Sequence, residues 1–147
     1  MSLKYDIEEQ NLCADRLAAE LPAVTNALPL DYLKAQRWFG SKSLDIRAVE
    51  LYDAAIMEQN LSYEVLLLLE IHYMQKAEAD LYFLPLVITE SPSTASIMQI
   101  VTLGKTYYIM DALQDEPFLR RQLTLLASAC KINAGKGSFE YENIRPL

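Results

Sequence analysis

The stretch Gln36-Arg37-Trp38-Phe39-Gly40-Ser41-Lys42 decides the fold, because helical sequence precedes it and strand sequence follows it. It holds the only tryptophan of the chain and the first glycine. Gly40 can adopt a positive φ without steric cost, which suits the end of a helix. Trp38 and Phe39 offer large apolar faces that can fill the joint between helix and sheet. Arg37 and Lys42 place positive charge near a helix C-terminus, where the helix dipole favours it. We therefore predict a helix stop with an aromatic plug, a structural motif made of Gln36, Arg37, Trp38, Phe39, Gly40 and Lys42.

Helices are predicted before this joint, and strands followed by a further helix are predicted after it. Hydrophobic spacing predicts helices over 8–24, 30–37 and 116–130, and strands over 46–57, 63–74, 79–89, 97–103, 105–110 and 139–144. Pro22 and Pro29 punctuate the first helix, Gly40 closes the second, and residues 133–138 form a flexible loop. The predicted fold class is α+β, a curved antiparallel sheet of about four to five strands packed with helices. We expect a single domain over 1–147, with a helical extension over 1–27 and a tail over 138–147.

Some side chains can be assigned to faces from the spacing of apolar residues. In the strand 46–57, alternation places Ile46, Ala48 and Glu50 on one face and Val49 with Leu51 on the other. Pro85 lacks a backbone N–H, so it belongs at a sheet edge or a bulge. Asp115 can cap the last helix. That helix carries an apolar stripe formed by Leu119, Leu123, Leu126 and Cys130.

Composition restricts the partners of the protein. The chain has 147 residues, is 52% hydrophobic and carries a net charge of −7. An acidic surface disfavours nucleic acid. No apolar run reaches the roughly 18 residues that a membrane span needs. No signal-peptide pattern opens the sequence, so we expect a cytoplasmic protein that binds no membrane. Cys13 and Cys130 form no C-x-x-C pair, and we expect both to be buried on helices.

The sequence contains no recognisable set of catalytic residues. His72 is the only histidine and lies in the most apolar strand, which favours a structural role. Gly135-Lys136-Gly137-Ser138 follows a helix and lacks the order of a phosphate-binding loop. The neighbouring carboxylates are those expected on solvated faces or at helix caps, namely Glu8, Glu9, Asp115, Glu116, Glu140 and Glu142. We therefore expect no catalytic, cofactor-binding or metal-binding residue in this chain.

Several motifs nevertheless resemble those of one protein family. They are Leu33-Lys34-Ala35-Gln36-Arg37-Trp38-Phe39-Gly40-Ser41-Lys42 with Ile46-Arg47-Ala48-Val49, Tyr82-Phe83-Leu84-Pro85-Leu86, Tyr108-Ile109-Met110-Asp111-Ala112-Leu113, and Glu116-Pro117-Phe118. In this order they resemble the N-terminal cap of bacterial maltokinases, from about Leu28 to about Gly137. Ser41 stands where that family usually has a second glycine.

The resemblance implies a cystatin-like cap that is catalytically silent by itself. The resemblance also implies a whole enzyme that uses ATP and Mg²⁺ to phosphorylate maltose to maltose 1-phosphate for α-glucan synthesis. Such an enzyme is often fused to trehalose synthase. The partners it implies are the kinase lobes of the same parent protein, toward which the tail 138–147 would lead. Related caps imply a second acceptor, since similar kinases act on glucosamine.

A free-standing, cystatin-like interaction module is the alternative from another class. Its exposed edge strands could add a partner strand or pair two chains into a homodimer. Gln36 to Gly40 also partly matches the Q-x-V-x-G of cystatin protease inhibitors. That motif lies in a hairpin, whereas this one lies between a helix and a strand, so inhibition is disfavoured.

Overall fold

A computed structural model describes residues 12–37, 39–60 and 62–142 of the chain. The helices are α2 (Ala14–Asn26), α3 (Leu30–Ala35) and α4 (Glu116–Ala127), with a 3₁₀ turn η1 (Ala112–Gln114). The strands are β1 (Ile46–Glu58), β2 (Ser62–Tyr73), β3 (Asp80–Thr89), β4 (Ser96–Thr102), β5 (Lys105–Asp111), β6 (Lys131–Asn133) and β7 (Ser138–Glu140). None of the described helices is long and apolar enough to cross a membrane.

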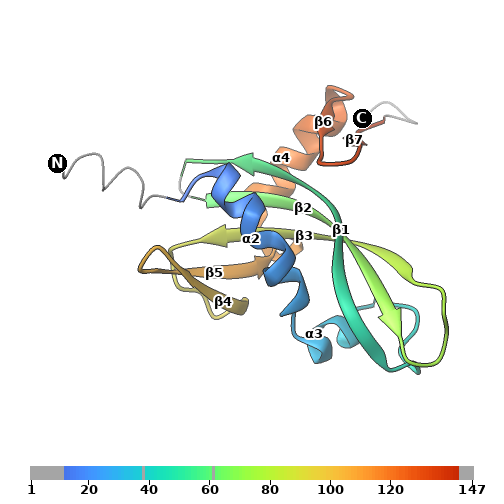
Figure 1. Cartoon of the computed structure of the whole chain (residues 1–147). Helices are drawn as coiled ribbons and strands as arrows, with labels where there is room; N and C mark the ends of the chain where they lie inside the picture. The colour runs from blue at the N-terminus through green and yellow to red at the C-terminus, as the bar shows by residue number, and fades with distance from the viewer. Residues whose placement is uncertain (1–11, 38, 61, 143–147) are drawn as a thin grey trace.

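Five strands form one antiparallel sheet in the order β1-β2-β3-β5-β4, which confirms the predicted fold class. The sheet is strongly curved, with α2 crossing in front of it and α4 behind it (Figure 1). Successive side chains of a β-strand point to opposite faces of the sheet, so each inner strand can contribute side chains to a core on either face. We call the face under α2 the first face and the face under α4 the second face.

The first face carries the larger core. Leu17 and Leu21 of α2, which lie inside the predicted extension 1–27, are buried against Leu67, Leu69 and Ile71 of β2. The second face has a smaller core, formed by Ala55, Leu66, Val87, Ala112 and Phe118. Val65 and Leu67 are buried on the first face and Leu66 on the second, so this part of β2 is buried on both sides, as the continuous apolar run predicted.

Strand β1 departs from simple alternation at two places. Its pairing with β2 shifts register between Ile46 and Ala48 and again between Leu51 and Asp53. An extra residue in a strand reverses which side chains face the core beyond it. Ile46 therefore packs in the first core with Val49, and its predicted place beside Ala48 and Glu50 is wrong.

The central hairpins follow the turn chemistry of the sequence. Pro85 lies in an inner strand, but β5 pairs with β3 only from Leu86 to Thr89, so Pro85 sits at a local edge. Between β4 and β5, Leu103 and Gly104 have φ of 55° and 73°, the conformation of a tight hairpin turn. The predicted hairpin around Gly104 is thus confirmed.

The ends of two helices differ from their predictions. Helix α2 continues through Pro22 to Asn26, because Leu21 and Val24 on either side are buried and hold it against the sheet. The predicted start over 8–11 lies outside the described residues. Helix α4 stops at Ala127, and Ser128 follows as its cap.

Helix α4 also presents a different face from the predicted one. Asp115 caps it, accepting a hydrogen bond from the N–H of Phe118 at 3.0 Å. Phe118 is the buried anchor, whereas Leu119 and Leu123 are 41% and 59% exposed. One residue turns a helix by about 100°, so an anchor at Phe118 swings the leucine stripe away from the sheet.

The last part of the chain forms a hairpin where a loop and one strand were predicted. Strand β6 pairs with β7 in register from Lys131 opposite Glu140 to Asn133 opposite Ser138. The predicted strand over 139–144 is therefore shifted, and residues 143 and 144 lie outside the described part. The cysteines also differ from prediction: Cys13 is exposed just before α2, and Cys130 is half-buried after α4.

Candidate functional site

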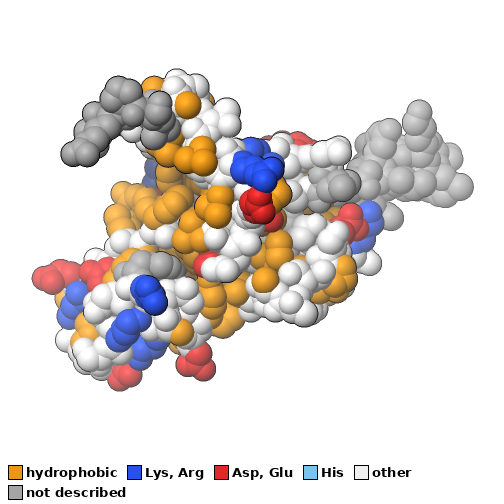
Figure 2. Space-filling model, turned by 180° about the vertical axis from the view of Figure 1, so that it is seen from behind, with side chains coloured by type: hydrophobic (Ala, Val, Ile, Leu, Met, Phe, Trp, Pro, Cys, Tyr) orange, Lys and Arg blue, Asp and Glu red, His pale blue; other side chains and the backbone are white. Residues whose placement is uncertain are grey.

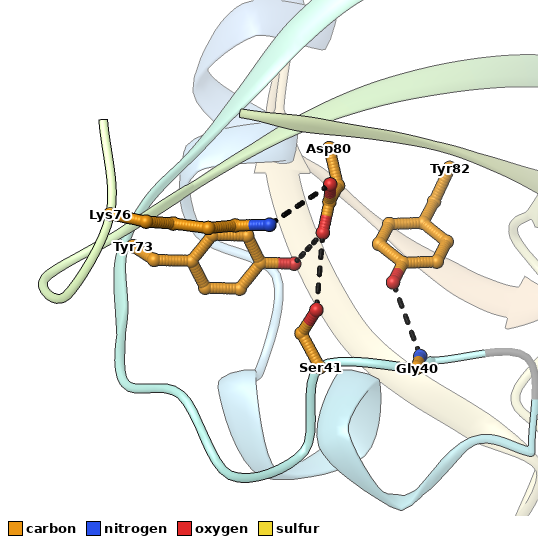
Figure 3. Close-up of polar contacts among 6 residues, drawn as sticks. All are labelled: Gly40, Ser41, Tyr73, Lys76, Asp80 and Tyr82. Carbon is orange, nitrogen blue, oxygen red and sulfur yellow. Dashed lines mark hydrogen bonds and ion pairs between the residues drawn. The ribbon is translucent and has the colours of Figure 1, made fainter. Parts of the chain in front are cut away.

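The described part of the Gln36–Lys42 motif runs from the end of α3 toward β1 and rests on the hairpin that joins β2 to β3. Figure 3 shows Gly40 and Ser41 beside Tyr73, Lys76, Asp80 and Tyr82. The motif thus joins the connection between α3 and β1 to a hairpin that lies far from it in the sequence.

Phe39 is the apolar centre of this contact. Its side chain is completely buried, with its ring stacked on that of Tyr82 at a centroid distance of 5.2 Å. The ring of Tyr73 lies at 6.4 Å, tilted by 51°. Phe39 is therefore the predicted aromatic plug between helix and sheet. Trp38, predicted to share this role, lies outside the described residues.

Asp80 collects the polar contacts around the plug. Its Oδ2 accepts hydrogen bonds from the Tyr73 hydroxyl at 2.8 Å and the Ser41 hydroxyl at 3.2 Å. Its Oδ1 lies 3.4 Å from the Lys76 Nζ. Beside it, the Gly40 N–H donates to the Tyr82 hydroxyl at 3.1 Å. Figure 3 shows that the bonds of Ser41 and Gly40 fasten the motif to the β2–β3 hairpin, while Tyr73 and Lys76 hold Asp80 within that hairpin.

The electrostatics of this network fit an anchoring role. The hydrogen bond from Tyr73 lowers the pKa of Asp80, and Ser41 and Lys76 act in the same direction against partial burial. Burial raises the pKa of Tyr73, and its bond to Asp80 adds to this rise. Asp80 is thus held as a carboxylate and Tyr73 as a neutral donor.

Lys42, rather than Gly40, completes the end of α3. The Lys42 Nζ donates to the backbone carbonyls of Lys34, at 2.8 Å, and Gln36, which confirms the predicted favourable charge at this helix end. The helix already ends at Ala35, and its cap Gln36 is extended. Gly40 lies beyond this end and has no positive φ, so the prediction that it closes the helix is wrong.

The remaining motif residues take different places. The Gln36 side chain donates to the Tyr32 carbonyl at 2.9 Å, inside α3. Arg37 is exposed. The structure therefore brings Phe39, Gly40 and Lys42 into one contact region, while Arg37 points to solvent.

A surface hollow of about 560 Å³ lies elsewhere, beside η1 and the start of α4. Two carboxylates line it, and both accept hydrogen bonds from backbone N–H groups. Asp111 accepts from the Leu113 N–H at 2.9 Å, and Asp115 caps α4. Asp111 also accepts from the Tyr32 hydroxyl. These acids are committed to structure, which argues against their use as a catalytic pair.

Two further carboxylates hold elements in place. Glu64 is fully buried on the second face and pairs with Arg121 of α4. Asp53 accepts from the backbone N–H of Lys136 at 3.0 Å and of Gly137 at 3.1 Å. Burial alone would raise the pKa of Asp53, but these N–H groups together lower it.

The partners of the motif, Asp80, Tyr73 and Tyr82, were not predicted from the sequence. Nothing in their local pattern separates them from ordinary strand residues, because their role depends on a chain crossing from elsewhere. Glu64 did carry a signal, since a carboxylate next to a run of buried aliphatic residues requires a partner.

Comparison with known proteins agrees with the motifs. The family model described as the maltokinase N-terminal cap domain matches residues 32–115. No curated protein and no solved structure matched the chain. The matched segment runs from α3 through the whole five-stranded sheet to the residue that caps α4. The chain therefore belongs to the maltokinase N-terminal cap domain family.

Proposed function

We propose that this chain is a non-catalytic cap that packs on the kinase lobes of a cytoplasmic, maltokinase-like protein. In that protein, lobes other than the cap use ATP and Mg²⁺ to convert maltose to maltose 1-phosphate, in α-glucan and trehalose metabolism. The observation that carries this proposal is the family match over residues 32–115. The anchoring character of the Phe39 and Asp80 contacts supports it, since they stiffen the domain.

The second face offers a surface for this packing. Leu81 and Phe83 of β3 are 50% and 47% exposed, and Leu119 and Leu123 of α4 also point outward. Phe83 lies opposite Leu68 of β2, which places it on the second face, and its ring is 5.8 Å from that of Phe139. Hydrophobic side chains gather in the middle of the view from behind (Figure 2). We propose that these exposed side chains of β3 and α4 take part in the packing, because exposed apolar side chains mark protein contacts, and we call Leu81, Phe83, Leu119 and Leu123 the docking patch.

The activity assay is direct. The purified chain is incubated with ATP, Mg²⁺ and maltose, with an intact maltokinase as the positive control. We expect no maltose 1-phosphate above the enzyme-free background. Formation of the product at a rate proportional to the concentration of the chain would contradict the proposal.

An interaction module that pairs through an edge strand is the second candidate. One observation favours it: Val101 of the edge strand β4 is 73% exposed. The other edge, β1, carries two register shifts against one in β4, and such shifts discourage strand addition. A homodimer of this kind would be weakened by Val101→Lys in sedimentation experiments, whereas packing through the docking patch would not.

The sugar acceptor is a separate question. A cap of a glucosamine kinase would share the same fold and the same docking patch, and acceptor choice would rest with the catalytic lobes. Comparing maltose and glucosamine as substrates of the assembled kinase distinguishes the two.

A further inference from the structure

The only histidine of the chain lies between two carboxylates on the second face of the sheet. The His72 Nε2 is 2.8 Å from the Glu70 Oε1 and 3.4 Å from the Glu50 Oε2. All three ligand atoms fall within 4.8 Å of one another. The side chains are 20%, 31% and 56% exposed for His72, Glu70 and Glu50, so the group is open to solvent.

The strand register creates this arrangement. Glu50 of β1 lies directly opposite Glu70 of β2, and Ala48 lies opposite His72. Residues 70 and 72 share a face of β2. Glu50 stands between the two register shifts of β1, which fix where its side chain points.

Like charges directly opposite each other destabilise a pair of strands. Among the described residues, no lysine or arginine forms an ion pair with Glu50 or Glu70; their ion pairs run to His72 alone. A cation bound between the two carboxylates would offset this repulsion.

The donor atoms suit one class of cation. Imidazole nitrogen and carboxylate oxygen are both ligand types of Zn²⁺, and a set of three protein ligands leaves its fourth position to water. Tetrahedral Zn²⁺ separates its ligand atoms by about 3.4 Å, which is close to the spacing of His72 and Glu50. His72 and Glu70 lie at the shorter distance of 2.8 Å as a hydrogen-bonded pair, and the ion would replace that hydrogen bond. Mg²⁺ prefers oxygen ligands and is not expected to bind through the imidazole.

We propose that Glu50, Glu70 and His72 form a binding site for a divalent transition metal ion, with Zn²⁺ as the best match. The ion would join the edge strand β1 to β2 beside the register shifts. From the sequence alone, we expected no metal-binding residue and a structural role for His72. The pairing of β1 with β2 places Glu50 beside His72. Because Glu50 lies 22 positions before His72 in the sequence, the two residues form no recognisable metal-ligand spacing.

The test uses the untagged full chain carrying Cys13→Ser and Cys130→Ser, because thiolates also bind Zn²⁺. A single histidine gives one set of imidazole proton signals in an NMR titration. We expect Zn²⁺ to shift these signals and to bind once per chain by calorimetry, while Mg²⁺ leaves them unchanged. Glu50→Gln and Glu70→Gln should each weaken Zn²⁺ binding by about tenfold or more.

The matched control is Glu78→Gln, which removes one charge from an exposed loop residue. It should bind Zn²⁺ as the parent does. Glu50→Gln relieves a like-charge contact, so it is expected to fold. The proposal is overturned if Zn²⁺ leaves the His72 signals in place, or if both glutamine variants bind it with the parental affinity.

Discussion

Phe39 is the residue on which the joint between helix and sheet depends. Its ring is fully buried against Tyr73 and Tyr82, so Phe39→Ala leaves a cavity that the sheet cannot fill. We expect the free energy of unfolding to fall by about 3–5 kcal/mol, measured by urea denaturation. Phe83→Ala removes the same side chain from a half-exposed site and should cost only about 1–1.5 kcal/mol. Equal losses for the two variants would contradict the plug.

Asp80 predicts how acid weakens the domain. Its pKa is lower in the folded chain than the ordinary value of 3.8, so the unfolded chain binds the proton more readily. The stability it contributes is complete above the ordinary value and is lost as pH falls through the lower folded pKa. Melting temperatures between about pH 5 and pH 2 should therefore fall less steeply for Asp80→Asn than for the parent.

The control for this measurement is Asp31→Asn, which changes an exposed carboxylate on α3. It should retain the parental slope. An unchanged slope for Asp80→Asn would mean that the bonds from Tyr73 and Ser41 do not favour the carboxylate.

At this scale the sequence predicted the plug but not its surroundings. An aromatic residue after a helix is a local signal, and Phe39 is buried accordingly. Asp80 lies 41 positions later, and its bond to Ser41 exists only after the sheet has formed. Local patterns carry no information about such a pair.

Among the elements, α4 is fixed by an ion pair as well as by Phe118. Arg121→Ala would leave the fully buried Glu64 without its charge partner, and we expect a loss of about 3 kcal/mol in urea denaturation. The double variant Glu64→Leu with Arg121→Met replaces both charges by apolar groups and should recover most of that loss. A double variant no more stable than Arg121→Ala would contradict this account of α4.

The β6–β7 hairpin depends on Asp53. The second register shift of β1 turns this carboxylate toward the backbone N–H groups of Lys136 and Gly137. A Cβ on Gly135 would lie only 3.0 Å from the Asp53 Oδ1, so the chain passes close to the carboxylate. Asp53→Ala should increase amide hydrogen exchange over residues 131–140, with β2 unaffected. Asp53→Asn keeps one acceptor and should show a smaller increase.

Element types were predictable where the hydrophobic period was strong. The strands β2 to β5 and the Gly104 hairpin lie close to their predicted bounds. The errors occur where packing overrides pattern: α2 ends at Asn26, two residues beyond its predicted end, and α4 faces the sheet with Phe118 and Arg121 instead of its leucine stripe. The hairpin β6–β7 is too short to give a periodic signal.

At the scale of the whole molecule, the two faces of the sheet differ in how they are covered. The first face holds the larger core under α2, whereas the second face leaves the docking patch and the Glu50, Glu70 and His72 group exposed. A cap that packs through one face requires this asymmetry. The exposed leucines of α4, which the sequence placed inward, belong to the proposed contact surface.

The affinity of this chain for the kinase lobes of a maltokinase lacking its own cap tests the cap role most directly. We predict measurable binding that Phe83→Ser and Leu123→Ser each weaken by about tenfold or more, while Val101→Ser on β4 leaves it unchanged. The absence of binding by the parent chain, or full binding by both docking-patch variants, would contradict the account.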